Sequence, residues 1–209
     1  MNEKRGKFIV IDGCDGAGKS LMVNLLAKEL PSDNFIFTRE PGGTPFSEKI
    51  RNLMIDKDAI FATAETQFAL AWAGRHEHMK RKILPALEAG VNVISDRFDS
   101  STYAFQICGQ EAWHLKDLFW ETREVYLRDF KPDIYIMLDV EVEEGIRRIS
   151  RKTEVKSHFD EREIDFHRRT KEGYFEFSKR VEHKIVDANA EPEVVKKELA
   201  GIIREITNL

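Results

Sequence analysis

The chain has 209 residues, of which 42% are hydrophobic and 33% are charged. This composition excludes a disordered or fibrous chain and predicts one globular domain over residues 1–209. The formal net charge of −4 argues against a nucleic-acid polymer as partner, because proteins that bind such polymers carry a basic excess, but it allows a small anionic ligand.

Cysteine content and hydrophobic run lengths indicate the cellular setting. The chain has two cysteines, Cys14 and Cys108, so no disulfide framework is implied and a reducing compartment fits. The polar N-terminus lacks a secretory core, and no apolar run reaches the about 20 residues that a membrane span needs. We therefore expect a soluble, cytoplasmic protein with no membrane partner.

Short apolar runs alternate with longer helical patterns, which is typical of a parallel α/β sheet. We expect strands at Lys7–Asp12, Phe35–Thr38, Val91–Ser95, Ile134–Leu138 and Lys184–Val186. Helices are predicted from about Lys19 to Leu30, from about Ala64 to Ala89, and from near Pro192 onward. Pro85 can kink the second of these helices, and Gly90 is a natural C-cap for it.

The segment from Arg147 to Arg169 is dense in charged residues, with few apolar residues between Arg151 and Glu163. Two interpretations stay open. A charge run is usually a solvated helix face with salt bridges. The alternative is a lid over about residues 151–163 that closes on a polyphosphate, as lids do in phosphoryl-transfer enzymes.

The segment after the first predicted strand has the pattern of a P-loop, Gly13-Cys14-Asp15-Gly16-Ala17-Gly18-Lys19-Ser20. Its glycines let the backbone curl so that N–H groups point at an anion, and the following helix N-terminus adds a positive dipole end. Lys19 can reach the terminal phosphates, and the Ser20 hydroxyl can bind Mg²⁺. The pattern predicts a nucleoside triphosphate site without separating a kinase from a switch protein.

Two predicted strands are followed by arginines, Arg39 and Arg97. Ligands of open parallel sheets collect at the carboxyl ends of the strands. Because guanidinium groups match phosphate oxygens, Arg39 is placed to hold an acceptor phosphate and Arg97 to neutralise the transferred group. Asp96 can fix magnesium through water or orient the attacking phosphate. The alternatives are a surface arginine in a tight turn for Arg39 and a structural Asp96–Arg97 ion pair.

The chain resembles the thymidylate kinase family in blocks that keep the family's order and spacing over nearly its whole length. These are Phe8–Ser20 (FIVIDGCDGAGKS), Thr38–Thr44 (TREPGGT) with Glu48–Arg51 (EKIR), Asp96–Gln106 (DRFDSSTYAFQ), Pro132-Asp133 before Leu138-Asp139-Val140, and Asp165–Tyr174 (DFHRRTKEGY). The resemblance implies a P-loop NTPase fold, with a five-stranded parallel sheet flanked by helices on both faces and a short basic lid. It also implies transfer of the terminal phosphate of ATP to dTMP with Mg²⁺, and a homodimer.

The resemblance also assigns roles to matching residues. It implies ATP binding by the P-loop and by Arg148 beside the adenine, and metal binding by Ser20 and Asp96. Catalysis would rest on Lys19, Arg97 and a lid cation, because Ala17 in the P-loop is not basic; the candidates are Arg151, which we favour, Arg147, Arg148, Lys152 and Lys156. The implied acceptor-binding residues are Asp12, Asp15, Arg39, Arg51, Arg75, Arg97, Thr102, Phe105 and Gln106. Trp72, next to Ala71, is a further candidate from its position alone, although it points about 100° away on an ideal helix.

Three of these assignments have alternatives from the residues alone. Asp12 could cap the end of its strand, and Arg75 could be an exposed helix arginine. The resemblance suggests a cis peptide bond before Pro41, whereas base rates favour trans.

Some positions depart from the family's pattern. Ala71 stands where the family has a Phe that stacks on thymine, and such stacking is worth about 1–3 kcal/mol per base. Phe105 replaces a Tyr, and Ser157-His158 replaces an Asp-Arg pair in the lid. A kinase for another (deoxy)nucleoside monophosphate or for a nucleoside therefore stays open. The alternative from a different class is a P-loop switch protein, although the chain has no Asn/Thr-Lys-x-Asp guanine motif.

Overall fold

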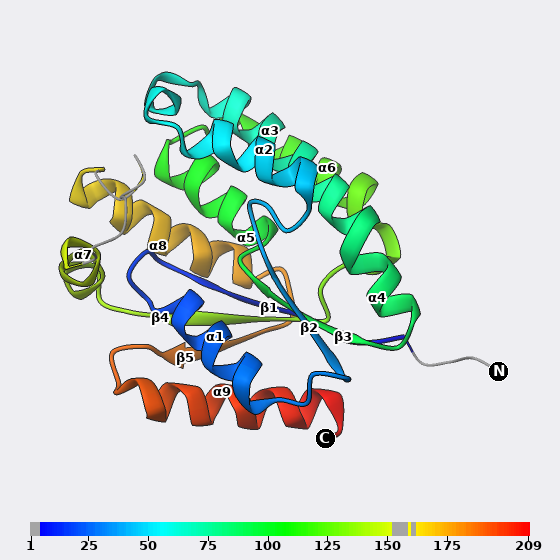
Figure 1. Cartoon of the computed structure of the whole chain (residues 1–209). Coiled ribbons are helices and arrows are strands. Elements are labelled where there is room, and N and C mark those ends of the chain that lie inside the picture. The colour runs from blue at the N-terminus through cyan, green and yellow to red at the C-terminus, as the bar shows by residue number, and fades with distance from the viewer. Residues whose placement is uncertain (1–4, 152–158, 160–161) are drawn as a thin grey trace.

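The computed structural model describes residues 5–151, 159 and 162–209 and shows a parallel sheet with helices on both faces (Figure 1). The strand order is β2-β3-β1-β4-β5, and every neighbouring pair is parallel. This confirms the predicted fold class, and each expected strand is found within two residues of its predicted bounds. The strands are β1(Phe8–Gly13), β2(Phe35–Arg39), β3(Asn92–Asp96), β4(Ile134–Asp139) and β5(His183–Asp187).

Helices α1 and α9 cover one side of the sheet, and α3, α5, α6 and α8 lie on the other side (Figure 1). In the described part of the chain the α-helices are α1(Lys19–Glu29), α2(Pro45–Ile55), α3(Ala64–His78), α4(Leu84–Glu88), α5(Asp99–Thr102), α6(Lys116–Leu127), α7(Val142–Ser150), α8(Ile164–Ser178) and α9(Pro192–Thr207). Shorter helical segments are η1(Lys57–Phe61), η2(Met79–Ile83), η3(Tyr103–Gly109), η4(Trp113–Leu115) and η5(Arg128–Phe130). None of these helices is long and apolar enough to cross a membrane.

The long helix predicted from Ala64 to Ala89 is present but interrupted. Helix α3 passes into the π-helical segment η2 before α4 begins, with Pro85 in the first turn of α4. Proline has no N–H to donate and its ring crowds the carbonyl one turn earlier, so a widened turn just before it relieves both problems. Gly90 has a φ of 78°, the left-handed conformation expected at a helix C-terminus.

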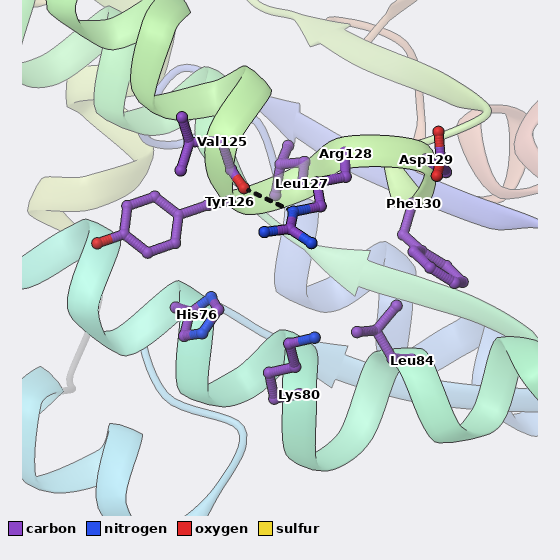
Figure 2. Close-up of a pocket in the computed structure, with 9 residues that line it drawn as sticks. All are labelled: His76, Lys80, Leu84, Val125, Tyr126, Leu127, Arg128, Asp129 and Phe130. Carbon is purple, nitrogen blue, oxygen red and sulfur yellow. Dashed lines mark hydrogen bonds between the residues drawn. The ribbon is translucent and has the colours of Figure 1, made fainter.

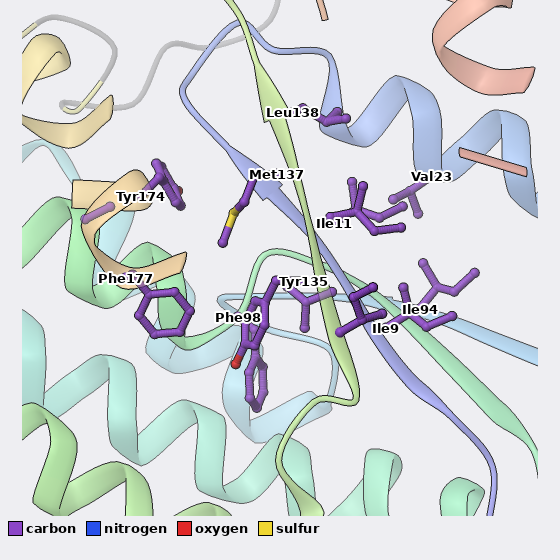
Figure 3. Packing of buried hydrophobic residues seen from close by; sticks show 14 of the residues in the cluster. Ile9, Ile11, Val23, Ile94, Phe98, Tyr135, Met137, Leu138, Tyr174 and Phe177 are labelled. Carbon is purple, nitrogen blue, oxygen red and sulfur yellow. The ribbon is translucent and has the colours of Figure 1, made fainter. Parts of the chain in front are cut away.

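The hydrophobic core lies on both faces of the sheet. Phe8, Ile9, Val10 and Ile11 are each 0% exposed, as expected for a central parallel strand, which reads as a continuous apolar run. Figure 3 shows Ile9 and Ile11 towards Val23 of α1, and Tyr135 and Met137 of β4 on the opposite side, towards Phe177 of α8. With both faces covered, the carboxyl ends of the strands, where the loops gather, are left to form a site.

Candidate active site

The P-loop joins the end of β1 to α1. Gly13, Gly16 and Gly18 have φ values of 141°, 79° and 85°, which only glycine adopts without strain. A side chain at Gly16 would also collide with the backbone of Gly145 in α7. The loop therefore has the curled backbone that anion binding requires, and α7 is packed directly against it.

Lys19 lies inside this loop. It is 5% exposed, and its Nζ donates hydrogen bonds to the carbonyls of Gly13 at 2.8 Å and Cys14 at 2.6 Å. Burial and the nearby Arg97 lower the pKa of Lys19, while the carboxylates around it act in the opposite direction. The ammonium group of Lys19 thus lies within the curled loop, where the P-loop pattern predicts that the terminal phosphates bind.

Ser20 and Asp96 bring oxygen ligands together at the same edge. The Ser20 hydroxyl donates to Asp96 Oδ2 at 2.6 Å, while Asp96 Oδ1 is buried and has no hydrogen-bond partner. An unpartnered carboxylate oxygen beside a hydroxyl fits a hard divalent cation. Among the described residues no cluster of three His, Cys, Asp or Glu could hold a metal alone. The pair therefore fits a cation that takes its other ligands from phosphate and water, which is how Mg²⁺ is usually bound.

Arg97 links the end of β3 to the P-loop. One of its Nη atoms forms an ion pair with Asp15, and the other donates to Ser101 Oγ at 3.2 Å and Tyr174 Oη at 3.1 Å. Burial lowers the pKa of Arg97, but Asp15, Tyr174 and Asp12 outweigh it and raise this pKa well above its ordinary value. Within the part of the chain that the structure describes, Arg97 pairs with Asp12 and Asp15, so the alternative of an Asp96–Arg97 ion pair is wrong.

Asp12 is fully buried beneath this arginine. Its carboxylate accepts hydrogen bonds from Ser100 Oγ at 2.6 Å, Ser101 Oγ at 2.9 Å and Tyr174 Oη at 2.9 Å. It also accepts a hydrogen bond from the Gly13 N–H at 2.9 Å. Asp12 thus caps the end of its strand, which is the alternative that the residues alone left open. Asp12 therefore anchors α5 and α8 under the site.

Arg39 and Arg51 meet at the loop after β2. Both guanidinium groups donate to the carbonyl of Pro41, at 2.9 and 3.1 Å, and Arg39 forms an ion pair with Glu48 at 2.9 Å. The Glu40–Pro41 peptide bond is cis, as the resemblance suggested. Burial, together with the neighbouring Arg39, lowers the pKa of Arg51. The side chain of Arg39 is 45% exposed, so Arg39 is a surface arginine. It is nevertheless held next to Arg51 by the shared carbonyl of Pro41.

Arg75 is 4% exposed, so the alternative of an exposed helix arginine is wrong. Its Nε donates to Glu40 Oε2 at 2.9 Å, and its Nη2 donates to the Phe98 carbonyl at 3.0 Å and Thr102 Oγ1 at 3.1 Å. The guanidinium carbon lies 4.7 Å from the ring centroid of Trp72 and 5.1 Å from that of Phe98. Nη1 is buried without any hydrogen-bond partner. An unsatisfied buried donor costs about 1–3 kcal/mol, which a ligand that accepts from it would recover.

The aromatic candidates lie beside these arginines. Trp72 is 2% exposed and packs against Phe119 and Tyr126, so it supports Arg75 from the core side. Phe105 is 6% exposed, and its ring centroid is 5.2 Å from the guanidinium carbon of Arg97. Both rings therefore face an arginine of the site.

Two further positions concern the acceptor. Gln106 is buried, and its Nε2 donates to Gln67 Oε1 at 3.2 Å. Ala71, which stands at the family's stacking position, packs with Ile50 and Met54 of α2. Ala71 therefore takes part in apolar packing between α2 and α3.

Most of the predicted lid, residues 151–163, lies outside the described residues, including Lys152, Lys156, Ser157 and His158. Arg151 is described and exposed at the end of α7. Arg147 and Arg148 form ion pairs with Glu144, and Arg148 also donates to the carbonyl of Ala188 at 2.9 Å and, more weakly, to that of Gly16 at 3.4 Å. The salt-bridged face expected for a charge run is therefore present at α7, and Arg148 borders the P-loop.

Several residues that sequence reasoning missed hold this site together: Glu40, His78, Ser100, Ser101 and Tyr174. They are polar and at least half-buried, but none has a local motif of its own. All of them except His78 fall inside blocks that resemble the family. Their proximity to the predicted arginines depends on the fold.

A cavity of about 400 Å³ lies apart from these residues, between α3 and the C-terminal end of α6. Figure 2 shows His76, Lys80 and Leu84 on one side of it and the segment 125–130 on the other. The Arg128 side chain points into this space while its Nε donates to the Val125 carbonyl at 3.4 Å. No predicted site residue lines this cavity, so the polar cluster at the strand ends remains the candidate site.

The sheet order, the loop after β1 and the buried lysine with its converging arginines define the class of P-loop phosphotransferases. A family model described as thymidylate kinase matches residues 11–199. The chain belongs to the thymidylate kinase family. It is therefore a kinase, and the switch-protein alternative is set aside.

Curated relatives support this assignment over nearly the whole chain. The thymidylate kinase of Clostridium novyi is 34% identical over 205 residues, covering 96% of this chain and 99% of the relative. That of Ruthia magnifica is 36% identical over 207 residues, covering 96% and 98%. That of Vesicomyosocius okutanii is 38% identical over 190 residues, covering 89% and 91%.

Proposed function

We propose that the chain transfers the terminal phosphate of ATP to dTMP, giving dTDP and ADP in nucleotide biosynthesis. The observation that carries this acceptor is the buried Nη1 of Arg75, which has no hydrogen-bond partner, whereas Nη2 donates to Thr102. A donor of this kind requires a hydrogen-bond acceptor, such as a base carbonyl. The similar proteins are named thymidylate kinases, which points to thymine as that base.

ATP is proposed to lie in the P-loop with its adenine beside Arg148, which reaches the carbonyl of Ala188. Ser20 and Asp96 would hold Mg²⁺, which neutralises charge on the donor phosphates when bound. Lys19 and Arg97 stabilise the charge that spreads over the transferred group, with Arg151 as the lid cation. No general base is needed, because a monophosphate is already anionic near neutral pH.

The acceptor phosphate is proposed to bind Arg39 and Arg51, which already converge on one carbonyl. Thr102, Phe105 and Gln106 would surround the base and sugar, with Asp12 and Asp15 near the sugar and Trp72 behind Arg75. Catalysis is then positioning and charge stabilisation, without a covalent intermediate.

A homodimer and a cytoplasmic location complete the proposal. Leu118 and Val125, two turns apart on one stripe of α6, are 46% and 63% exposed, and a second copy of the chain would cover them. Cys14 and Cys108 are both free and buried, which fits a reducing compartment.

A coupled assay over a panel of acceptors tests the substrate. With ATP and Mg²⁺ we expect turnover of dTMP to exceed that of dCMP, because cytosine has an amino group where thymine presents a carbonyl to Arg75. It should also exceed that of thymidine, because thymidine lacks the phosphate that Arg39 and Arg51 would bind. A matched reaction with excess EDTA should show no turnover. No rate with dTMP and a high rate with another acceptor would reject dTMP, while ATP hydrolysis that ignores every acceptor would reject the kinase reaction.

A further inference from the structure

A chain of buried polar side chains runs from β2 to α3 behind Arg75. Thr38 Oγ1 lies 2.7 Å from His78 Nε2, and His78 Nδ1 lies 3.0 Å from Glu40 Oε1. The other carboxylate oxygen of Glu40, Oε2, accepts from Arg75 Nε at 2.9 Å. The side chains of Arg75, Glu40 and His78 are 3%, 4% and 0% exposed, so water does not compete for these bonds.

The surrounding backbone keeps this chain in place. The Glu40 N–H donates to the Asp96 carbonyl at 2.9 Å, which ties the loop after β2 to the end of β3. Gly43, with a φ of 90°, lies so close to the His78 ring that any side chain there would collide with it. The imidazole is therefore enclosed, and its two nitrogens can reach only the partners that they have.

Each carboxylate oxygen of Glu40 has a different partner, and this determines which nitrogens of Arg75 remain available. A carboxylate that is free to rotate tends to take a guanidinium with both oxygens. A carboxylate can only accept hydrogen bonds, so His78 donates from Nδ1 and occupies Oε1. Glu40 then engages Arg75 through Nε alone, and the carbonyl of Phe98 and Thr102 Oγ1 engage Nη2. Only Nη1 is left for a ligand.

We infer that Glu40 and His78 are positioning residues that set the choice of acceptor base, by holding Arg75 so that Nη1 alone faces the base. This inference rests on the proposed function, in which the acceptor base lies against Arg75. The arrangement selects a base with a hydrogen-bond acceptor at that position, such as the carbonyl of thymine. It rejects a base with an amino group there, such as cytosine, because two donors would then face each other.

Steady-state kinetics of Glu40→Gln and His78→Leu, with dTMP and dCMP as acceptors, test the inference. Each variant should raise KM for dTMP about tenfold and lower the preference for dTMP over dCMP about tenfold, the size expected for one buried charged hydrogen bond. KM for ATP and kcat should stay within about twofold of the original values, since the P-loop is untouched.

A merely structural role would give a different pattern, and two controls reveal it. His78→Asn places an amide N–H close to the position of Nδ1, so it should restore the preference for dTMP that His78→Leu loses. Ile203→Val in α9 removes a buried methyl group at a side chain that is 0% exposed, so it lowers stability and should leave acceptor preference unchanged. If His78→Leu does not fold, Thr38→Val removes only the bond to Nε2 and should weaken the preference in the same direction.

The inference is overturned if the preference between the two acceptors is unchanged in Glu40→Gln, or if KM for ATP rises in parallel with KM for dTMP. Failure of the proposed function has a separate signature. In that outcome the unaltered enzyme itself prefers another acceptor, and the variants are then measured with that acceptor against dTMP.

Discussion

Arg97 connects three parts of the site, because it lies at the end of β3 and contacts both the P-loop and α8. It adopts a φ of 68°, unusual for a residue other than glycine. Its partners Asp15, Ser101 and Tyr174 come from three different elements. A side chain held this way needs little reorganisation when charge develops on a transferred phosphate.

Arg97→Ala should therefore lower kcat by about 10³–10⁵, the range known for arginines that stabilise phosphoryl transfer. Arg168→Ala is the matched control, because Arg168 is 51% exposed and paired with Glu143 on the surface. Single-turnover measurements at saturating ATP and dTMP would separate the chemical step from binding. Near-normal turnover in Arg97→Ala would remove this arginine from the mechanism.

At the scale of elements, the packing of α8 on the π-helical segment η3 places Tyr174 beside Arg97. Gly173 allows this approach, because a Cβ there would lie 2.8 Å from Cys108 Sγ and 2.9 Å from Ala104 Cα. Gly109 has the same function further along, where a Cβ would lie 2.7 Å from the Phe166 ring. The absence of side chains at two positions thus brings the helix after the predicted lid segment into contact with the site.

Gly173→Ala should destabilise the protein by about 1–3 kcal/mol, the usual cost of overpacking, despite the better helix propensity of alanine. Gly201→Ala in α9 is the opposite control, since nothing lies within 4 Å of its added Cβ, and it should stabilise by up to about 1 kcal/mol. Urea unfolding of both variants measures this difference. Equal stabilisation by the two substitutions would contradict the close packing of α8 on η3.

At the scale of the whole molecule, helix α6 leaves apolar side chains exposed to solvent in a single copy. Leu118 and Val125 share one face of the helix, and Tyr126 next to Val125 is 39% exposed. Large exposed apolar groups that gather on one face mark association surfaces.

The double substitution Leu118→Glu with Val125→Glu should convert a dimer into a monomer, because charges buried in an interface without partners are costly. Light scattering after size-exclusion chromatography gives the mass directly. The matched control is Leu21→Glu, at an exposed leucine of α1 that is 49% accessible on the other side of the sheet. A monomeric unaltered chain, or a dimer that survives the double substitution, would contradict the proposed interface.

Prediction from sequence succeeded where the signal was local. The central strands are continuous apolar runs because both of their faces are buried, and the P-loop is a contiguous motif, so both could be found. Segment η3 could not, because all of its residues from Tyr103 to Gly109 are buried and no polar face gives it a helical period.

The sequence by itself determined the class of fold, the phosphate loop and the arginines available to it, since each depends on residues that are close together along the chain. Only the tertiary structure decided that Nη1 of Arg75 is the nitrogen of this side chain left without a hydrogen-bond partner. Glu40 and His78 are 38 positions apart, and Asp12 and Tyr174 are 162 apart. Hydrogen bonds between such residues form only once the sheet has brought its strand ends and covering helices together, and no local pattern records them.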